Sequence, residues 1–136
     1  MAAEVVRTGG CLCGAVRYEV QGEPYVSGLC HCTTCRKLTG SSFSATANWR
    51  RDQFRMTGEL QTYERRSFCP NCGSRLFYLL DDGAEIFLGT LDQAPYGIEP
   101  MLEVWTIRRE HWLPSVPGTT SYGENPPKSN SPAPPL

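Results

Sequence analysis

Apolar and polar residues alternate along most of this chain, and the alternation predicts β-strands. In CGAVRYEV, residues 13–20, charged residues separate Val16, Tyr18 and Val20, as in a strand with one buried face. Later segments are short, rich in aromatic or β-branched residues, and bounded by turn formers. They predict further strands at residues 42–49, 60–66, 75–80, 84–89 and 101–107.

Two local signals complete the expected secondary structure. Asp82-Gly83 lies between two apolar runs and predicts a hairpin. TTCRKLTG, residues 33–40, has the features of a helical turn, and Gly40 is expected to end it. We therefore expect a mainly β domain of antiparallel strands.

The end of the chain has a different composition. Seven of the eleven prolines fall between Leu113 and Leu136, among Ser, Gly, Thr and Asn. Such a segment buries too little apolar surface to offset the entropy of ordering it. We therefore divide the chain into a β domain at residues 1–112 and a Pro-rich tail at residues 113–136. The part after about Gly123 is expected to be mobile or loosely attached; the alternative is a functional strap over the domain.

Composition places this domain among soluble proteins. The chain has 136 residues, of which 40% are hydrophobic and 20% charged, which suits one globular domain. No apolar run approaches the roughly 20 residues that span a bilayer, and the start MAAEVVRTGG lacks the basic and apolar regions of a signal peptide. We therefore expect a cytoplasmic protein without a membrane partner. The net charge of −1 also argues against nucleic-acid binding, which needs an excess of Lys and Arg.

The seven cysteines are the main chemical signal. In a reducing compartment they are better explained as metal ligands than as disulfides, and an odd number cannot pair completely. They form a first pair (Cys11 and Cys13), a central cluster (Cys30, Cys32 and Cys35) and a last pair (Cys69 and Cys72). In CPNCG, a tight turn lets the two sulfurs of the last pair reach one zinc ion.

Spacing alone allows two assignments. In the first, Cys32 and Cys35 join the last pair in one closed zinc site, and three cysteines are left over. In the second, the first and last pairs form one site and the central cluster forms another. Three ligands within six residues close almost no loop, which favours the second. Residues 36–68 also make a long connection for a simple zinc ribbon. Neither argument excludes the first assignment.

Three segments resemble a known family. GGCLCGAVRYEV, LCHCTTCRKLTGSSF and FCPNCGSRLFY, in that order, are similar to the glutathione-dependent formaldehyde-activating enzymes, a family that includes centromere protein V. The resemblance runs from about residue 8 to 112 and includes all seven cysteines. It implies a small β-tent-like fold of paired sheets, shared with the zinc-containing accessory proteins of small GTPases. It also implies the second assignment, with a structural zinc on the first and last pairs and a catalytic zinc on the central cluster.

The resemblance further implies a carbon–sulfur lyase. The reaction would add the thiol of glutathione to formaldehyde, giving S-(hydroxymethyl)glutathione, or reverse that addition. Three protein ligands leave one tetrahedral position for water or substrate, as in catalytic zinc sites. Zinc could deprotonate the thiol or polarise the carbonyl oxygen. Three thiolates weaken its acidity, which favours the first role. The true thiol and aldehyde, and the oligomeric state, stay open.

Glutathione carries two carboxylates, so its pocket should contain cations. Arg36 and Lys37 directly follow the third cysteine of the central cluster and are the expected carboxylate ligands. Further candidates near the last pair are Arg65, Arg66 and Arg75.

Two histidines and a second function class complete the expectations. His31 lies between two ligands and is a candidate proton relay, although an extended backbone would point it away from the metal. His111 is expected to be a surface or packing residue. The alternative function is a non-catalytic, zinc-stabilised binding module. A pure scaffold would need only the four-ligand site, so the central cluster favours an enzyme.

Overall fold

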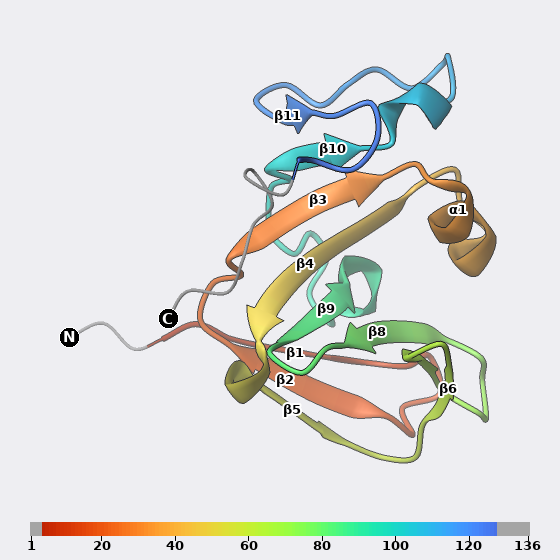
Figure 1. The fold of residues 1–136 in the computed structure, drawn as a ribbon. Coiled ribbons are helices and arrows are strands. Elements are labelled where there is room, and N and C mark those ends of the chain that lie inside the picture. Colours follow the sequence, from red (N-terminus) through yellow and green to blue (C-terminus); the bar gives the residue numbers. More distant parts are fainter. Residues whose placement is uncertain (1–3, 128–136) are drawn as a thin grey trace.

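The computed structural model describes residues 4–127 as a mainly β protein with two sheets (Figure 1). The smaller sheet has the order β1-β2-β5 and the larger β11-β10-β3-β4-β9-β8-β7-β6. The strands are β1 (Val6–Gly10), β2 (Arg17–Gln21), β3 (Val26–Cys30), β4 (Ser44–Arg50), β5 (Phe54–Thr57), β6 (Gln61–Tyr63), β7 (Arg66–Phe68), β8 (Arg75–Leu79), β9 (Gly83–Phe87), β10 (Leu102–Val104) and β11 (Thr120–Ser121). The helical segments are α1 (Thr33–Thr39) and the 3₁₀ turns η1 (Arg51–Gln53), η2 (Leu88–Thr90) and η3 (Thr106–Arg108).

The local signals agree with these elements in most places. The predicted helical turn is α1, and Gly40 ends it in the left-handed conformation with φ 69°. β8 and β9 form the predicted hairpin, in which the Leu80 N–H donates to the Gly83 carbonyl over 2.8 Å. The predicted strand at 60–66 is wrong in its middle. Glu64 and Arg65 take positive φ values of 48° and 66°, so the chain turns there from β6 into β7.

The hydrophobic core lies between the two sheets. The larger sheet contributes Trp49 and Phe77, and the smaller sheet contributes Tyr18 and Phe54, all nearly or completely buried. The Phe54 and Phe77 rings meet edge to face with centroids 4.9 Å apart. Burying a side chain of this kind contributes roughly 1.5–3 kcal/mol. The larger sheet includes β3, which ends at Cys30, the first cysteine of the central cluster.

The C-terminal segment is tied to the edge of the larger sheet. β10 pairs in parallel with β3, and β11 pairs in parallel with β10. The Trp105 N–H donates to the Glu124 carbonyl over 3.3 Å, and the Trp105 indole N–H donates to Asn125 Oδ1 over 2.9 Å. The described part of the predicted Pro-rich tail therefore contacts the domain through β11, Glu124 and Asn125. That it acts as a functional strap stays a prediction. The rest of the predicted tail, residues 128–136, lies outside the described residues.

Among residues 4–127, none of the helices has the length and apolar character needed to cross a membrane. In Figure 1, α1 lies where β3 ends and β4 begins. This is the end of the larger sheet where the central cluster is found.

Candidate metal centres and active site

The first and last cysteine pairs come together although 56 residues separate Cys13 from Cys69. The sulfurs of Cys11, Cys13, Cys69 and Cys72 all lie within 4.8 Å of one another, and we call them the four-sulfur group. The Sγ atoms of Cys11 and Cys13 are 3.6 Å apart, and those of Cys13 and Cys69 are 3.8 Å apart. Tetrahedral zinc with bonds of about 2.3 Å places its sulfurs about 3.8 Å apart. The residues present therefore fit a closed zinc site.

Local backbone geometry shapes this group. In the CPNCG turn, the Gly73 N–H donates to the Cys69 carbonyl over 2.8 Å, and Gly73 has a φ of 77°. That left-handed conformation favours glycine. The Val16 N–H donates to Cys11 Sγ over 3.2 Å, and the Asn71 amide donates to Cys13 Sγ over 3.3 Å. Donors of this kind stabilise thiolates, the form in which cysteine binds a metal.

Ser74 also acts on the four-sulfur group. Its hydroxyl lies 3.2 Å from Cys72 Sγ. The side-chain and backbone hydrogen bonds of Ser74 are the main cause that lowers the pKa of Cys72 to about 5. The group therefore contains a thiolate at neutral pH even without a metal. Ser74 and Asn71 were not predicted from the sequence, because spacing identifies the ligands and not the residues that hydrogen-bond to them.

The central cluster forms at the junction of a strand and a helix. Cys30 is the last residue of β3, Cys32 is the N-cap of α1, and Cys35 lies in its first turn. Their sulfurs lie within 4.8 Å of one another, and in the described chain no further His, Cys, Asp or Glu joins the group. The sulfurs are thus grouped as in the second assignment. Three sulfurs without a fourth protein ligand fit a zinc site with one open position.

Cys35 is the most acidic thiol of the central cluster. The hydrogen bond from the Cys30 thiol is the largest cause that lowers the pKa of Cys35 to about 6. The same contact raises the pKa of Cys30, so Cys35 loses its proton before Cys30 does. Ser44, which faces Cys30 across the β3–β4 pair, also lowers the pKa of Cys35. Without a metal, the cluster is expected to hold a thiolate at Cys35, ready to bind a cation.

His31 is turned toward the C-terminal segment. Its Nε2 lies 2.9 Å from Glu103 Oε1, and both side chains are buried. An ionised carboxylate can only accept, so Nε2 carries the proton. The His31 N–H also donates to the Val104 carbonyl over 3.1 Å. This orientation agrees with the argument that an extended backbone points His31 away from the ligands.

Two cavities adjoin the central cluster, one of about 720 Å³ and one of about 310 Å³. We call them the large and the small cavity. Cys32 lines the large cavity, Cys30 lines the small one, and Cys35 lines both. Glu85 and Asn125 are also shared. The cluster therefore borders both cavities.

The large cavity contains two guanidinium groups held against aromatic rings. Arg66 lies over the Tyr78 ring at 5.4 Å from its centroid, and Arg108 lies over the Trp105 ring at 4.8 Å. Arg66, Tyr78, Trp105 and Arg108 all line this cavity. Stacking restricts each side chain, and a planar guanidinium can bind a carboxylate through two donors. Arg66 Nη1 lies 3.2 Å from the exposed Glu64 carboxylate, so a substrate carboxylate would replace or share that contact.

The other predicted cations do not line either cavity. Arg36 donates to Glu110 over 2.6 Å and to the Arg108 carbonyl over 3.1 Å, so it ties α1 to the C-terminal segment. Arg65 pairs with Asp81, and Arg75 lies over the Phe68 ring. Arg108 was missed, because nothing in the sequence placed residues after β10 beside the cysteines.

A cross-strand row of polar residues leads from the large cavity to the small one. Asn48 on β4 faces Glu85 on β9, Glu85 faces Tyr78 on β8, and Tyr78 faces Arg66 on β7. Register partners share one face of a sheet. Burial and the nearby Cys35 raise the pKa of Glu85. Asn48 and Glu85 were not predicted, because they fall within segments that were interpreted only as strands.

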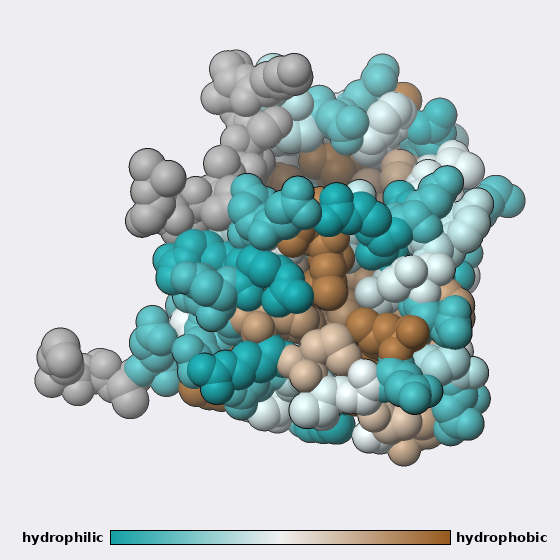
Figure 2. All heavy atoms as spheres, turned by 60° about the horizontal axis from the view of Figure 1, so that its bottom comes forward, coloured by the Kyte–Doolittle hydropathy of each residue, from teal (hydrophilic) through white to brown (hydrophobic). Residues whose placement is uncertain are grey.

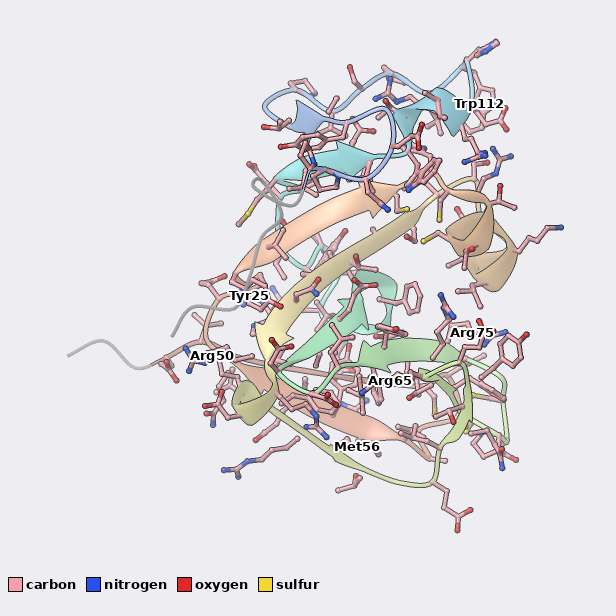
Figure 3. The ribbon with its side chains drawn as sticks, in the orientation of Figure 1. Tyr25, Arg50, Met56, Arg65, Arg75 and Trp112 are labelled. Atoms are coloured by element: carbon pink, nitrogen blue, oxygen red, sulfur yellow. The ribbon has the colours of Figure 1, made fainter. Side chains whose placement is uncertain are left out.

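A third cavity, of about 330 Å³, lies away from the cysteines of the central cluster. Its lining comes from β2, β5 and Thr8 and contains no cysteine. Met56 of β5 is one of the lining residues and lies on the lower side of the molecule in the view of Figure 3. Figure 2 turns this side forward and shows apolar side chains bordered by hydrophilic ones. The large and small cavities, in contrast, are lined by thiols of the central cluster, so they are the candidate substrate sites.

Comparison with known proteins agrees with this arrangement. Residues 6–108 match the model of the family described as glutathione-dependent formaldehyde-activating enzyme. A protein of Schizosaccharomyces pombe named "Uncharacterized lyase C29B12.13" is 32% identical over 81 residues, which cover 55% of this chain and 58% of that protein. The chain belongs to the glutathione-dependent formaldehyde-activating enzyme family. It spans little more than half the length of that relative.

Proposed function

We propose that this protein is a carbon–sulfur lyase that joins the thiol of glutathione to formaldehyde and cleaves the adduct. The observation that carries the proposal is the central cluster. Three sulfurs lie within 4.8 Å of one another without a fourth protein ligand in the described chain, at the junction of two cavities. Family membership supports the same reaction class.

We assign zinc to both cysteine groups. The four-sulfur group would hold a structural ion, because it offers four ligands at tetrahedral spacing. Cys30, Cys32 and Cys35 would hold a catalytic ion. When bound there, zinc would supply a positive charge that lowers the pKa of a substrate thiol or attracts a carbonyl oxygen.

The chain's own residues would bind and orient the thiol substrate. Arg66 and Arg108 line the large cavity and are the cations that we assign to the two carboxylates of glutathione. Arg36 and Lys37, predicted from the sequence, have less support, because neither lines the large cavity. Binding at the carboxylates would bring the thiol to the sulfurs that border the same cavity.

His31 is best explained as a positioning residue. Its Nε2–H is held by the buried Glu103 carboxylate, so it fixes the backbone between Cys30 and Cys32. A direct proton relay through His31 has less support, because this proton points toward β10 and not toward a cavity. A cytoplasmic location stays part of the proposal.

The test is acceleration of a reaction that also proceeds unaided. The protein loaded with zinc is mixed with glutathione and formaldehyde, and exchange between free and adduct forms is measured by NMR. Faster exchange than in buffer with free zinc supports the lyase. Two bound zinc ions without acceleration for any thiol would favour the alternative, a zinc-stabilised binding module.

A further inference from the structure

We propose that the small cavity binds the aldehyde, and that its preferred aldehyde is a short, neutral, hydroxylated one, larger than formaldehyde. The inference rests on the proposed lyase function and adds its second substrate class. It is carried by the position, volume and lining of the small cavity.

The charges of the two cavities separate the two substrates. The large cavity contains Arg66 and Arg108, whereas the lining of the small cavity contains no Arg, Lys or His among the described residues. Glu85 lines both cavities, so the difference in charge between them comes from the two guanidinium groups. These attract a thiol with carboxylates to the large cavity. Because the thiol substrate occupies the large cavity, we assign the aldehyde to the small cavity, which Cys30 and Cys35 border.

The small cavity is too large for formaldehyde alone. Its volume is about 310 Å³, at the lower end of the roughly 300–1,000 Å³ typical of pockets for small molecules. Formaldehyde has two non-hydrogen atoms and is close in size to water, which occupies about 30 Å³ in the liquid. The cavity follows β3 from Cys30 back to Tyr25, which lies just before that strand at the end opposite α1 (Figure 3). An aldehyde carbon beside the sulfurs would thus leave space for a substituent along β3.

The lining of this space favours a neutral substituent with hydroxyl groups. Thr46 and Asn48 on β4 border it beside Glu85. Asn48 hydrogen-bonds with both Glu85 and Tyr25. These amide, hydroxyl and carboxyl groups can donate to and accept from a hydroxyl group. A carboxylate in the same place would face Glu85 without a cation to neutralise it, which opposes binding.

The reaction is the same addition with a larger partner. A sulfur electron pair forms the carbon–sulfur bond, the π pair of the C=O bond moves to oxygen, and that oxygen takes the proton that the thiol has lost. The product is a hemithioacetal whose side group lies in the small cavity. No oxidant or other co-reactant is needed.

The test compares four aldehydes with glutathione and zinc-loaded protein: formaldehyde, glycolaldehyde, propionaldehyde and glyoxylate. We expect kcat/KM for glycolaldehyde to exceed that for glyoxylate by about tenfold or more, the scale on which a mismatched polar contact discriminates. Glycolaldehyde should also be a better substrate than propionaldehyde. Acceleration with formaldehyde but not with glycolaldehyde would overturn this inference and leave the lyase function standing. Acceleration with none of the four would overturn both.

Two variants at Thr46 test the cavity itself. Thr46→Phe places a ring in the small cavity and should reduce kcat/KM for glycolaldehyde by about tenfold or more, and by more than it reduces kcat/KM for formaldehyde. Dispersed amide signals in the NMR spectrum and an unchanged zinc content show that the variant has folded. Thr46→Val keeps the shape of the side chain but removes its hydroxyl group. It should reduce the ratio of kcat/KM for glycolaldehyde to kcat/KM for propionaldehyde. Thr62→Phe, at an exposed position on β6, is the matched control. Equal losses for both aldehydes in Thr46→Phe would contradict the assignment of the small cavity.

Discussion

Glu103 of β10 holds His31, the residue between the first two cysteines of the central cluster, through a buried contact of 2.9 Å between Oε1 and Nε2. Its second oxygen accepts the Val116 N–H over 3.1 Å and lies 3.4 Å from Arg109 Nη2. Burial opposes ionisation of Glu103, but the contacts with His31, Val116 and Arg109 together lower its pKa. One carboxylate therefore joins the C-terminal segment to the backbone that presents the ligands.

Removal of this carboxylate should destabilise the protein strongly. Glu103→Ala leaves His31 buried without its partner, and breaking a buried pair of this kind costs about 3–5 kcal/mol. Glu103→Gln should cost less, because the amide oxygen can still accept one hydrogen bond. The free energy of unfolding is measured with urea. Glu110→Gln removes the half-exposed partner of Arg36 and is the control, with an expected cost of at most about 1 kcal/mol. Equal costs for Glu103→Ala and Glu110→Gln would contradict the central role of Glu103.

The four-sulfur group should be required for folding. Cys72→Ser removes one of its four ligands, and structural zinc binding is itself folding free energy. We expect little folded protein, seen as loss of dispersed amide signals in the NMR spectrum. A strong chelator should unfold the wild type in the same way. A folded Cys72→Ser variant that binds as much zinc as the wild type would show that this group holds no structural ion.

The guanidinium groups of the large cavity should determine affinity for glutathione. Arg66→Ala removes one carboxylate contact, and a charged hydrogen bond contributes about 1.5–3 kcal/mol. KM for glutathione should therefore rise by about tenfold or more, and Arg108→Ala should act similarly. Kinetics with 2-mercaptoethanol, which has no carboxylate, should change little. The control is Arg65→Ala, because Arg65 also pairs with an exposed carboxylate, that of Asp81, but lines neither cavity. A KM effect of Arg66→Ala that is equal for the two thiols would refute carboxylate binding.

Tyr18 should make the fold sensitive to alkali. Burial raises the pKa of its phenol to about 12, above the ordinary value of about 10. The folded state therefore favours the neutral phenol, and its contribution to stability is complete below about pH 10. That contribution is lost as the pH rises through the folded pKa, by up to about 3 kcal/mol.

Tyr18→Phe isolates this effect. The variant loses the contact with Thr90 Oγ1, which is 2.6 Å from the phenol oxygen, so it should be about 1 kcal/mol less stable at pH 8. Between pH 10 and 12 it should lose less stability than the wild type, as measured by denaturant unfolding at each pH. Parallel curves for the two proteins across this range would contradict the assignment.

The predicted strands include β2, β4, β8, β9 and β10, whereas β1, β3, β5 and β11 were missed. β1 contains Gly9 and Gly10, and β3 contains Gly28, so neither shows the expected alternation. In β3, Gly28 is needed where the Leu102 carbonyl comes close, since a Cβ there would lie 2.9 Å from that oxygen. The Leu102 carbonyl comes close because β3 pairs with β10, and no local sequence pattern predicts this pairing.

Part of the candidate site could also be predicted from the sequence, and part could not. Cysteine spacing identified the candidate metal ligands, because C-x-x-C and C-x-C pairs bring sulfurs together locally. It could not decide how the pairs combine, since that depends on the turn between β7 and β8 reaching the end of β1. The cations were placed by closeness in sequence to the ligands, which suggested Arg36. The fold instead brings Arg66 and Arg108 to the large cavity, from two elements far apart in the chain.

The zinc content of purified Cys35→Ser most directly tests the central claim, that the chain holds one structural zinc and one open, catalytic zinc. The wild type should contain two zinc ions per chain and Cys35→Ser one, while the variant stays folded and no longer accelerates glutathione–formaldehyde exchange. A Cys35→Ser variant that retains both ions and full exchange activity would contradict the account. So would one that unfolds as completely as Cys72→Ser.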